Sequence, residues 1–461
     1  MKLFIVSIAL VAIVGSAVGL SAAGWEAQAG TASASGTDKR PLLIVNGSTP
    51  DAISPDADRT TPPVTSSVVT VSDCKYTVYD CADPATKKFC VVIPEGLKTV
   101  RGLLVECNYA GGDSRQDWTF CHYYREFMHL HDFALVASAG DIPHVKAFQA
   151  FRDCLQKVSV DSRHPELDNA PYVAVGFSAG GGFASTLITM DPERTIAAGI
   201  IEARYNFTRW LPPNPPPAAA VLDAALAIPS VLFSGGKHNS PDIQTGVFQM
   251  VDDVFVPFRP KGAQYAWMVL PGYGHEYAEN RQDLLIMPLM DLAVRTRYPK
   301  DGEVTKGPLK LLSIDPATGW VADNTTWKSG LTKIVPAKEF KGDLGHSSWL
   351  QNEDIAFIYR AYATHDNPLT ITAPGPCGPG TPAVDPGSNV PITVDAGRFP
   401  NWKKLELYDG AKKLGTVTAA PARFTATNLT PGYHVFSVLG TDAEGTVRTS
   451  DPVMVIVRNL P

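Results

Sequence analysis

The stretch YVAVGFSAGGGFA at residues 172–184 decides the fold of this chain. Its first four residues form an apolar run typical of a buried parallel strand, and residues 183–190 can continue as a helix. Ser178 is the centre of a G-x-S-x-G pattern at the turn between them. Glycines suit such a turn because the backbone can approach closely only where side chains are absent. The pattern predicts that Ser178 is presented as a nucleophile; a purely structural glycine turn is the alternative.

Segments typical of strands and of helices alternate around this stretch. Apolar runs that predict strands lie at residues 102–106, 133–137, 197–202, 230–234 and 265–270. This alternation predicts an α/β fold, in which a mostly parallel sheet is covered by helices on both faces. The helix over residues 283–297 closes the order. Shorter β-rich pieces at residues 68–71, 75–78 and 89–93 predict an opening antiparallel set.

The chain of 461 residues is longer than one typical domain. A proline- and glycine-rich segment at residues 372–382 is typical of a linker, and short strands at the spacing of a β-sandwich follow it. We therefore predict a catalytic α/β domain, a small β-rich appendage, a linker and a terminal β-sandwich. Their expected bounds are 65–300, 301–370, 371–385 and 386–461.

The amino terminus has the pattern of a secretory signal peptide. A positively charged start precedes an apolar run over residues 3–20, and small residues with an A-x-A-type exit follow. We predict a signal peptide over residues 1–23, a leader or linker over residues 24–64, and a secreted protein that is extracellular or periplasmic. A retained anchor is the alternative, because the run is just long enough to span a bilayer. After cleavage, no membrane association is expected.

Composition excludes some classes of partner. Hydrophobic residues make up 44% of the chain and charged residues 19%, which is ordinary for a globular protein. The net charge of −6 offers no general basic surface, so nucleic acid is not an expected partner.

The cysteines suit an oxidising compartment. Pairing among Cys74, Cys81 and Cys90 would join the opening strands, although spacing alone does not define connectivity. A metal site is the alternative, built from Cys121, His122, His129 and His131. This segment has the pattern of one amphipathic helix over residues 117–131, and its spacing matches no common zinc motif. We predict disulfides and no metal.

A serine nucleophile needs a base that takes its proton. The last predicted strand of the sheet runs into the sequence PGYGHE, in which His275 follows two glycines. Parallel strands end at the same edge of a sheet, so this loop is expected beside Ser178. His275 is the candidate base, with a structural histidine as the alternative.

These motifs together resemble the α/β-hydrolase superfamily. FSAGG at residues 177–181 and GYGH at residues 272–275 are similar to secreted polyhydroxybutyrate-depolymerase-like enzymes and to feruloyl or acetylxylan esterases. The resemblance implies a Ser-His-acid triad that hydrolyses carboxylic esters of a polymer or plant-wall conjugate, without a cofactor. Residues 388–457 resemble a bacterial Ig-like module, which implies contact with polysaccharide or a cell surface.

The oxyanion hole departs from the pattern of those esterases. They usually carry His-Gly after the strand that ends here at Cys107, whereas this chain has Asn108 and Tyr109. A backbone N–H is independent of the side chain. The oxyanion donors are therefore expected to be the amides of Ala179 and Tyr109.

The triad acid is the second departure. Related esterases place an aspartate where this chain has about His238, and Asp242 is the nearest carboxylate. Glu202 competes with it, because some lipases place the acid after the preceding strand. Asp242 is the predicted acid and Glu202 the alternative; a weakened or absent acid is the third possibility.

Three hypotheses of function follow. The first is a secreted serine esterase that acts through an acyl-enzyme. The second is a serine peptidase of the same fold, although no β-propeller or other obvious gating domain precedes the core. The third is a surface or adhesion protein whose hydrolase core has decayed, and the retention of Ser178 and His275 argues against it.

Overall fold

The computed structural model describes most of the chain beyond the amino-terminal segment. The described residues are 64–71, 74–81, 88–139, 144–203, 206–207, 217–236, 247–271, 273–275, 282–326, 330–364, 368–373, 383–395, 401–418 and 422–458. The predicted signal peptide, the leader up to residue 63 and most of the predicted linker lie outside them.

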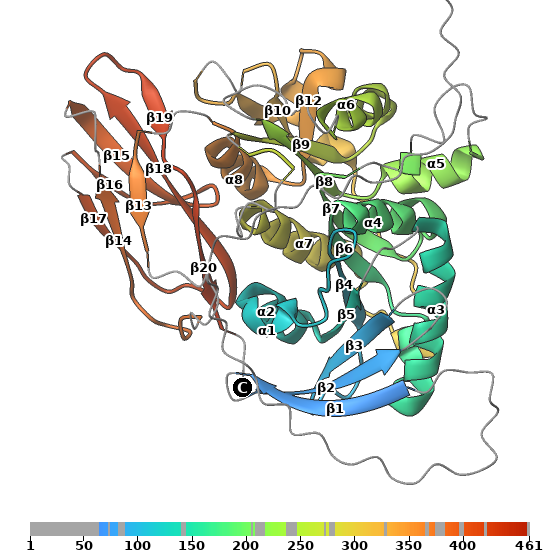
Figure 1. Cartoon of the computed structure of the whole chain (residues 1–461). Coiled ribbons are helices and arrows are strands. Elements are labelled where there is room, and N and C mark those ends of the chain that lie inside the picture. Colours follow the sequence, from blue (N-terminus) through green and yellow to red (C-terminus); the bar gives the residue numbers. More distant parts are fainter. Residues whose placement is uncertain are drawn as a thin grey trace, which may run out of the picture. The chain divides into compact units, whose positions relative to one another are not determined.

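A nine-stranded sheet forms the centre of the α/β part, in the order β1-β2-β3-β5-β4-β6-β7-β8-β9 (Figure 1). Its strands are β1 (Val64–Val71), β2 (Cys74–Cys81), β3 (Lys88–Pro94), β4 (Gly102–Cys107), β5 (Phe133–Ala139), β6 (Tyr172–Phe177), β7 (Thr195–Ile201), β8 (Ser230–Gly236) and β9 (Tyr265–Pro271). The first three strands pair antiparallel, and β3 pairs antiparallel with β5. The pairs from β5 through β4 to β9 are all parallel. The predicted mixed α/β sheet is thus confirmed.

Helices cover the two faces of this sheet. They are α1 (Asp117–Phe120), α2 (His122–His131), α3 (His144–Asp161), α4 (Ala179–Met190), α5 (Ala219–Leu226), α6 (Val247–Phe258), α7 (Asp283–Arg297) and α8 (Glu353–Ala363). One apolar cluster joins a face of the sheet to α2, α7 and α8, and a second joins the other face to α3, α4 and α6. Burial on both faces explains why β4, β6 and β7 are buried along their whole lengths.

The prediction of one helix over residues 117–131 is wrong. Cys121 separates α1 from α2 because its backbone is extended, with φ −86° and ψ 94°. Its N–H still makes the helical bond to the carbonyl of Asp117, and the extended ψ of Cys121 ends the short first helix. Such a single non-helical residue leaves the amphipathic pattern intact, so the pattern could not reveal the break.

The disulfide also differs from the prediction. Cys81 on β2 pairs with Cys154 on α3, 73 residues away, with 5.8 Å between their Cα atoms. The antiparallel register places Cys81 opposite Phe89, and Cys90 opposite Asp80, so the strands never bring two cysteines together. The bond therefore joins the sheet to a covering helix rather than strand to strand.

The appendage packs against the free edge of β9. Its sheet has the order β11-β10-β12, built from β10 (Trp320–Asp323), β11 (Ile334–Pro336) and β12 (Ser347–Leu350). Trp349 is buried, and its indole N–H donates to the carbonyl of Pro316 (2.9 Å). Trp320 is half-buried and packs against the apolar cluster that includes α2, α7 and α8. Trp327 lies outside the described residues. The two described tryptophans of the appendage are therefore part of a packed core.

The carboxyl-terminal part consists of two antiparallel sheets. One has the order β13-β14-β17, and in the other β20 pairs with β18 beside the order β16-β15-β18-β19. The strands are β13 (Thr370–Thr372), β14 (Val390–Asp395), β15 (Trp402–Asp409), β16 (Lys412–Val417), β17 (Ala422–Ala426), β18 (Gly432–Asp442), β19 (Val447–Thr449) and β20 (Val453–Val457). Buried residues of both sheets form one apolar cluster, and β14 alternates strictly between buried and exposed residues. That alternation is typical of a sheet with one buried face.

His434 on β18 provides a pH-dependent contribution to stability. Its Nδ1 lies 2.7 Å from Asp409 Oδ2 and its Nε2 lies 2.8 Å from the carbonyl of Thr430, so both ring nitrogens face acceptors. Burial lowers the pKa of His434, but the Asp409 carboxylate and the Thr430 carbonyl outweigh it and raise the pKa above its ordinary value.

We therefore expect this histidine to stabilise the fold most at low pH. A group whose folded pKa is raised contributes fully below its unfolded pKa of about 6.5 and loses that contribution as pH rises through the folded value. In urea denaturation, His434→Gln should lose more stability relative to the parent at pH 5.5 than at pH 9. Asp409→Asn should remove most of the difference between the two pH values. Equal losses at both pH values for His434→Gln would contradict the assignment.

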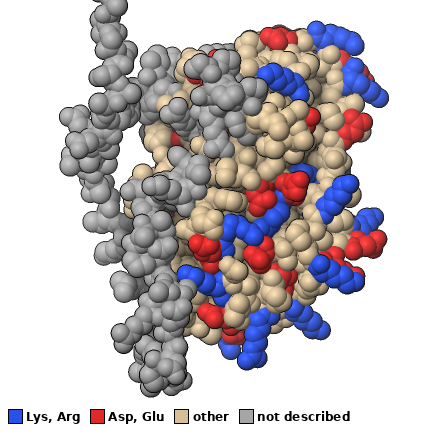
Figure 2. Space-filling view, turned by 90° about the vertical axis from the view of Figure 1, so that its right-hand side faces the viewer, with Lys and Arg blue, Asp and Glu red and all other residues tan. Residues whose placement is uncertain are grey.

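The charged surface is mixed in sign. On the face shown in Figure 2, basic and acidic side chains are interspersed among uncharged residues. Within the described residues, no helix is both long enough and apolar enough to cross a membrane.

Candidate active site

Ser178 lies at a strained turn between β6 and α4. Its φ of 54° and ψ of −117° are rare for a residue with a side chain. The surrounding backbone holds it there, since its N–H donates to the carbonyl of Ile201 (2.8 Å) and its carbonyl accepts from the N–H of Gly182 (3.0 Å). The strand, turn and helix predicted from the sequence are thus present around this serine.

Two glycines allow the turn to be this tight. A Cβ on Gly176 would collide with the backbone of Gly180 and Gly181. A Cβ on Gly180 would collide with the carbonyl of Cys107, at the end of β4. The start of α4 can therefore lie directly against the loop that follows β4.

The structure brings His275 and Ser178 together. The imidazole Nε2 lies 2.9 Å from Ser178 Oγ, across 97 residues of sequence. The ring of Phe177, the residue before the serine, lies 5.3 Å from the imidazole at an interplanar angle of 31°. Gly235 at the end of β8 admits the histidine loop, because a Cβ there would collide with the carbonyl oxygens of Tyr273 and Gly274.

Glu202 lies next to the serine in the sheet. The register of β6 and β7 pairs Phe177 with Ile201, so the residues that follow, Ser178 and Glu202, leave neighbouring strand ends. Glu202 is buried, with 1% of its surface exposed, and also has a positive φ of 48°. Its N–H donates to the carbonyl of Phe233 on β8 (3.1 Å). The predicted acid Asp242 lies outside the described residues.

The two predicted oxyanion donors differ in their surroundings. Ala179 is the first residue of α4, where backbone N–H groups have no partner within the helix and the helix dipole favours an anion. The Tyr109 N–H donates to Oδ1 of Asn108 (2.8 Å), whose Nδ2 donates to Asp117 (3.2 Å). An oxyanion bound at Tyr109 would therefore have to take the place of the Asn108 oxygen.

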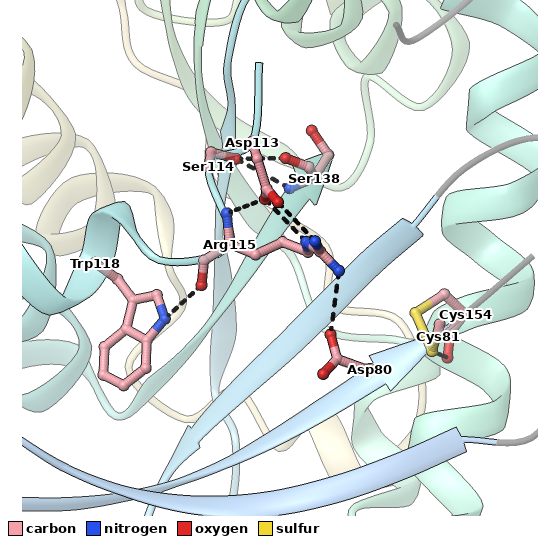
Figure 3. A network of polar contacts seen from close by, with 8 residues as sticks. All are labelled: Asp80, Cys81, Asp113, Ser114, Arg115, Trp118, Ser138 and Cys154. Atoms are coloured by element: carbon pink, nitrogen blue, oxygen red, sulfur yellow. Dashed lines mark hydrogen bonds and ion pairs between the residues drawn. A yellow bond between two sulfur atoms is a disulfide. The ribbon is translucent and has the colours of Figure 1, made fainter. Parts of the chain in front are cut away.

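A polar network supports the loop after β4 (Figure 3). Ser114 is fully buried, accepts from the N–H of Ser138 (3.0 Å), and has its hydroxyl 2.9 Å from the carbonyl of Ser138. Arg115 binds Asp113 through two nitrogens (2.9 and 2.6 Å) and lies 3.7 Å from Asp80 on β2. These contacts connect the loop that carries Tyr109 to β5 and β2. The sequence carried no signal for the contact of Ser114 with Ser138 or for that of Arg115 with Asp80, because these partners lie on distant strands.

The residues of the alternative metal site do not come together around one point, because His129 and His131 have different partners. His129 Nε2 lies 2.9 Å from the hydroxyl of Tyr76, and His131 Nε2 lies 2.9 Å from Asp291 on α7. Burial lowers the pKa of His122 and of His129 to about 4. Among the residues that the structure describes, no three His, Cys, Asp or Glu side chains are grouped to hold a metal ion.

Comparison with known proteins finds likenesses of structure only. No family model matches the chain, and no curated protein matches it. Among solved structures, it is similar to an S-formylglutathione hydrolase from Agrobacterium tumefaciens, with 12% identity, 50% of this chain and 97% of the other covered, and a TM-score of 0.33. It is also similar to an acetyl xylan esterase from Aspergillus awamori, with 10% identity, 46% and 98% covered, and a TM-score of 0.33. Fibronectin(III)-like modules of Clostridium thermocellum CbhA match with 19% identity, 20% and 98% covered, and a TM-score of 0.17.

Proposed function

We propose that this protein is a serine hydrolase that cleaves carboxylic esters of a polymer or plant-wall conjugate. The observation that carries the proposal is the 2.9 Å contact between His275 Nε2 and Ser178 Oγ. A base within hydrogen-bond distance of a hydroxyl is what nucleophilic catalysis requires. The strained turn exposes the Ser178 hydroxyl for attack on a substrate. The amino-terminal end of α4, directly after the serine, can bind the negative charge that forms during acyl transfer.

The chemistry divides into acylation and deacylation. Ser178 Oγ attacks the ester carbonyl while His275 Nε2 takes its proton, and the negative charge moves to the carbonyl oxygen. The C–O bond to the alcohol then breaks, and His275 returns the proton to the leaving alcohol. Water activated by the same imidazole attacks the acyl-enzyme, and this releases the acid and restores the serine.

The oxyanion is assigned to the amides of Ala179 and Tyr109. The Ala179 N–H lies at the start of α4, immediately after the nucleophile. In this structure the Tyr109 N–H donates to Asn108 Oδ1, so it becomes available to the oxyanion when Asn108 Oδ1 moves away. Asp242 is assigned as the acid that orients His275, with Glu202 as the alternative.

We also infer that the protein is exported. The predicted signal peptide over residues 1–23 motivates this, and the Cys81–Cys154 disulfide supports it, because disulfides persist in oxidising compartments. For the carboxyl-terminal part we propose an Ig-like module that contacts polysaccharide or a cell surface. Its two antiparallel sheets around one apolar cluster support the module assignment.

A substrate panel tests the proposed activity. The purified protein should hydrolyse p-nitrophenyl acyl esters, and Ser178→Ala should abolish this turnover. Turnover of aminoacyl anilides alone would instead identify a peptidase. No turnover of either class by the folded protein would favour a non-catalytic binding protein.

A further inference from the structure

A cavity of about 280 Å³ lies at the edge of the sheet where the appendage covers β9. Its walls include Phe248 from α6, Trp267 from β9 and Tyr359 from α8, together with Asn324 and His346 from the appendage. Neither Ser178 nor His275 is among the described residues that line it. The cavity is therefore distinct from the proposed catalytic pair.

One wall of the cavity is aromatic and held in place. The indole N–H of Trp267 donates to Ser234 Oγ (2.9 Å), which uses its one polar atom and fixes the ring. Phe248 and Phe255 pack against this indole, with ring centroids 4.7 and 5.5 Å away. The wall thus presents a rigid apolar surface, on which a flat ring gains contact at little cost in side-chain entropy.

Asn324 brings a side-chain amide to the cavity, and hydrogen bonds set its orientation. Asn324 Oδ1 lies 3.0 Å from the hydroxyl of Ser348 and 3.1 Å from that of Tyr359. Both hydroxyls are in turn bonded to the backbone of Trp267, by 2.9 Å from its N–H to Ser348 Oγ and 2.5 Å from Tyr359 to its carbonyl. Tyr359 gives its one hydroxyl proton to the Trp267 carbonyl, so the Ser348 hydroxyl is the group that donates to Asn324 Oδ1. This leaves the NH₂ group of Asn324 as a donor for a ligand.

Asp252 and His346 also bring polar groups to the cavity. Asp252 on α6 supplies acceptor oxygens. His346 binds Asp343 through Nδ1 (2.6 Å), which directs its Nε2 away from that carboxylate. No lysine or arginine is among the described lining residues, so the cavity is poorly suited to an anion.

We propose that this cavity binds a neutral, hydroxylated six-membered ring, either a pyranose or a phenol. The aromatic wall suits the flat face of such a ring, and the amide, carboxylate and imidazole suit hydroxyl groups at its edge. The volume lies just below the range of about 300–1,000 Å³ typical of drug-sized ligands, which matches a single ring. The site stands on its own residues and does not depend on the proposed esterase activity.

Calorimetry and saturation-transfer NMR on full-length Ser178→Ala protein test this site without turnover. The probes are methyl β-D-glucopyranoside, 4-methylphenol and toluene. We expect saturable binding of the glucoside or of the phenol, whichever ring the site takes, and much weaker binding of toluene. Binding of neither hydroxylated probe, or toluene bound as tightly as 4-methylphenol, would overturn the proposal.

A pair of threonine variants locates the binding. Thr325 lines the cavity at an exposed position, so Thr325→Phe should block it and weaken binding at least tenfold. Thr318→Phe is the matched control and should leave binding unchanged, because Thr318 is also exposed and does not line the cavity. Its hydroxyl donates to the backbone carbonyl of Asp315, much as that of Thr325 donates to the carboxylate of Asp323. Asp252→Ala, on the surface of α6, should also weaken binding. Unchanged affinity in both Thr325→Phe and Asp252→Ala would place the ligand elsewhere.

Discussion

Replacing Ser178 with alanine is expected to lower ester turnover by about 10⁴- to 10⁶-fold, because nucleophile and base act as a unit. His275→Ala should cost about as much, and the double variant little more than either single one. The 2.9 Å contact between the two side chains is the structural basis for this non-additivity. The measurement is kcat on the best p-nitrophenyl ester.

A serine on the same helix provides the control. Ser185 is buried on α4, and its hydroxyl donates to the carbonyl of Gly182 (2.8 Å). Ser185→Ala should change thermal stability but leave turnover per folded molecule near the parental value. Circular dichroism should show that Ser178→Ala remains folded. Near-parental turnover by either Ser178→Ala or His275→Ala would exclude the proposed site.

Asp242→Asn is expected to lower turnover by about 10⁴-fold and Glu202→Gln only severalfold. The acid of a triad fixes the histidine tautomer and stabilises the imidazolium, so its loss is large while the nucleophile stays in place. Both substitutions keep the size of the side chain and remove only its charge. The comparison therefore reports on electrostatics rather than on packing.

Asp253→Asn is the matched control, because this α6 aspartate is exposed and binds Gln249 (2.7 Å). It should leave turnover unchanged. A crippled Glu202→Gln beside an active Asp242→Asn would transfer the role to Glu202, which is buried on the strand end next to Ser178. Near-parental turnover by both variants would indicate a dyad without an acid.

Local pattern was sufficient for the turn and the order of the core elements. A run of apolar residues, a glycine-rich turn and a helical segment are properties of consecutive residues, so the strand, turn and helix at Ser178 followed from the sequence. The parallel sheet followed from the alternation of such segments. Because parallel strands end at one edge, the same reasoning placed His275 near Ser178, and the structure brings the two within 2.9 Å.

Tertiary structure alone decided contacts between distant segments. The partner of Cys81 depends on which helix covers β2, and the register of β2 and β3 keeps Cys90 away from it. The anchoring of the Tyr109 loop by the contact of Ser114 with Ser138 depends on strand order. The bond from the Tyr109 N–H to its neighbour Asn108 depends on the orientation of the Asn108 side chain, which also donates to Asp117.

The cavity beside β9 was likewise beyond sequence analysis. Asn324 and Trp267 are joined there by the hydroxyls of Ser348 on β12 and Tyr359 on α8. Ser348 lies 81 residues and Tyr359 92 residues from Trp267 in the chain. Hydrophobic periodicity records which face of an element is buried. It does not record which element covers that face, and this is why tertiary packing decided the cavity and its polar groups.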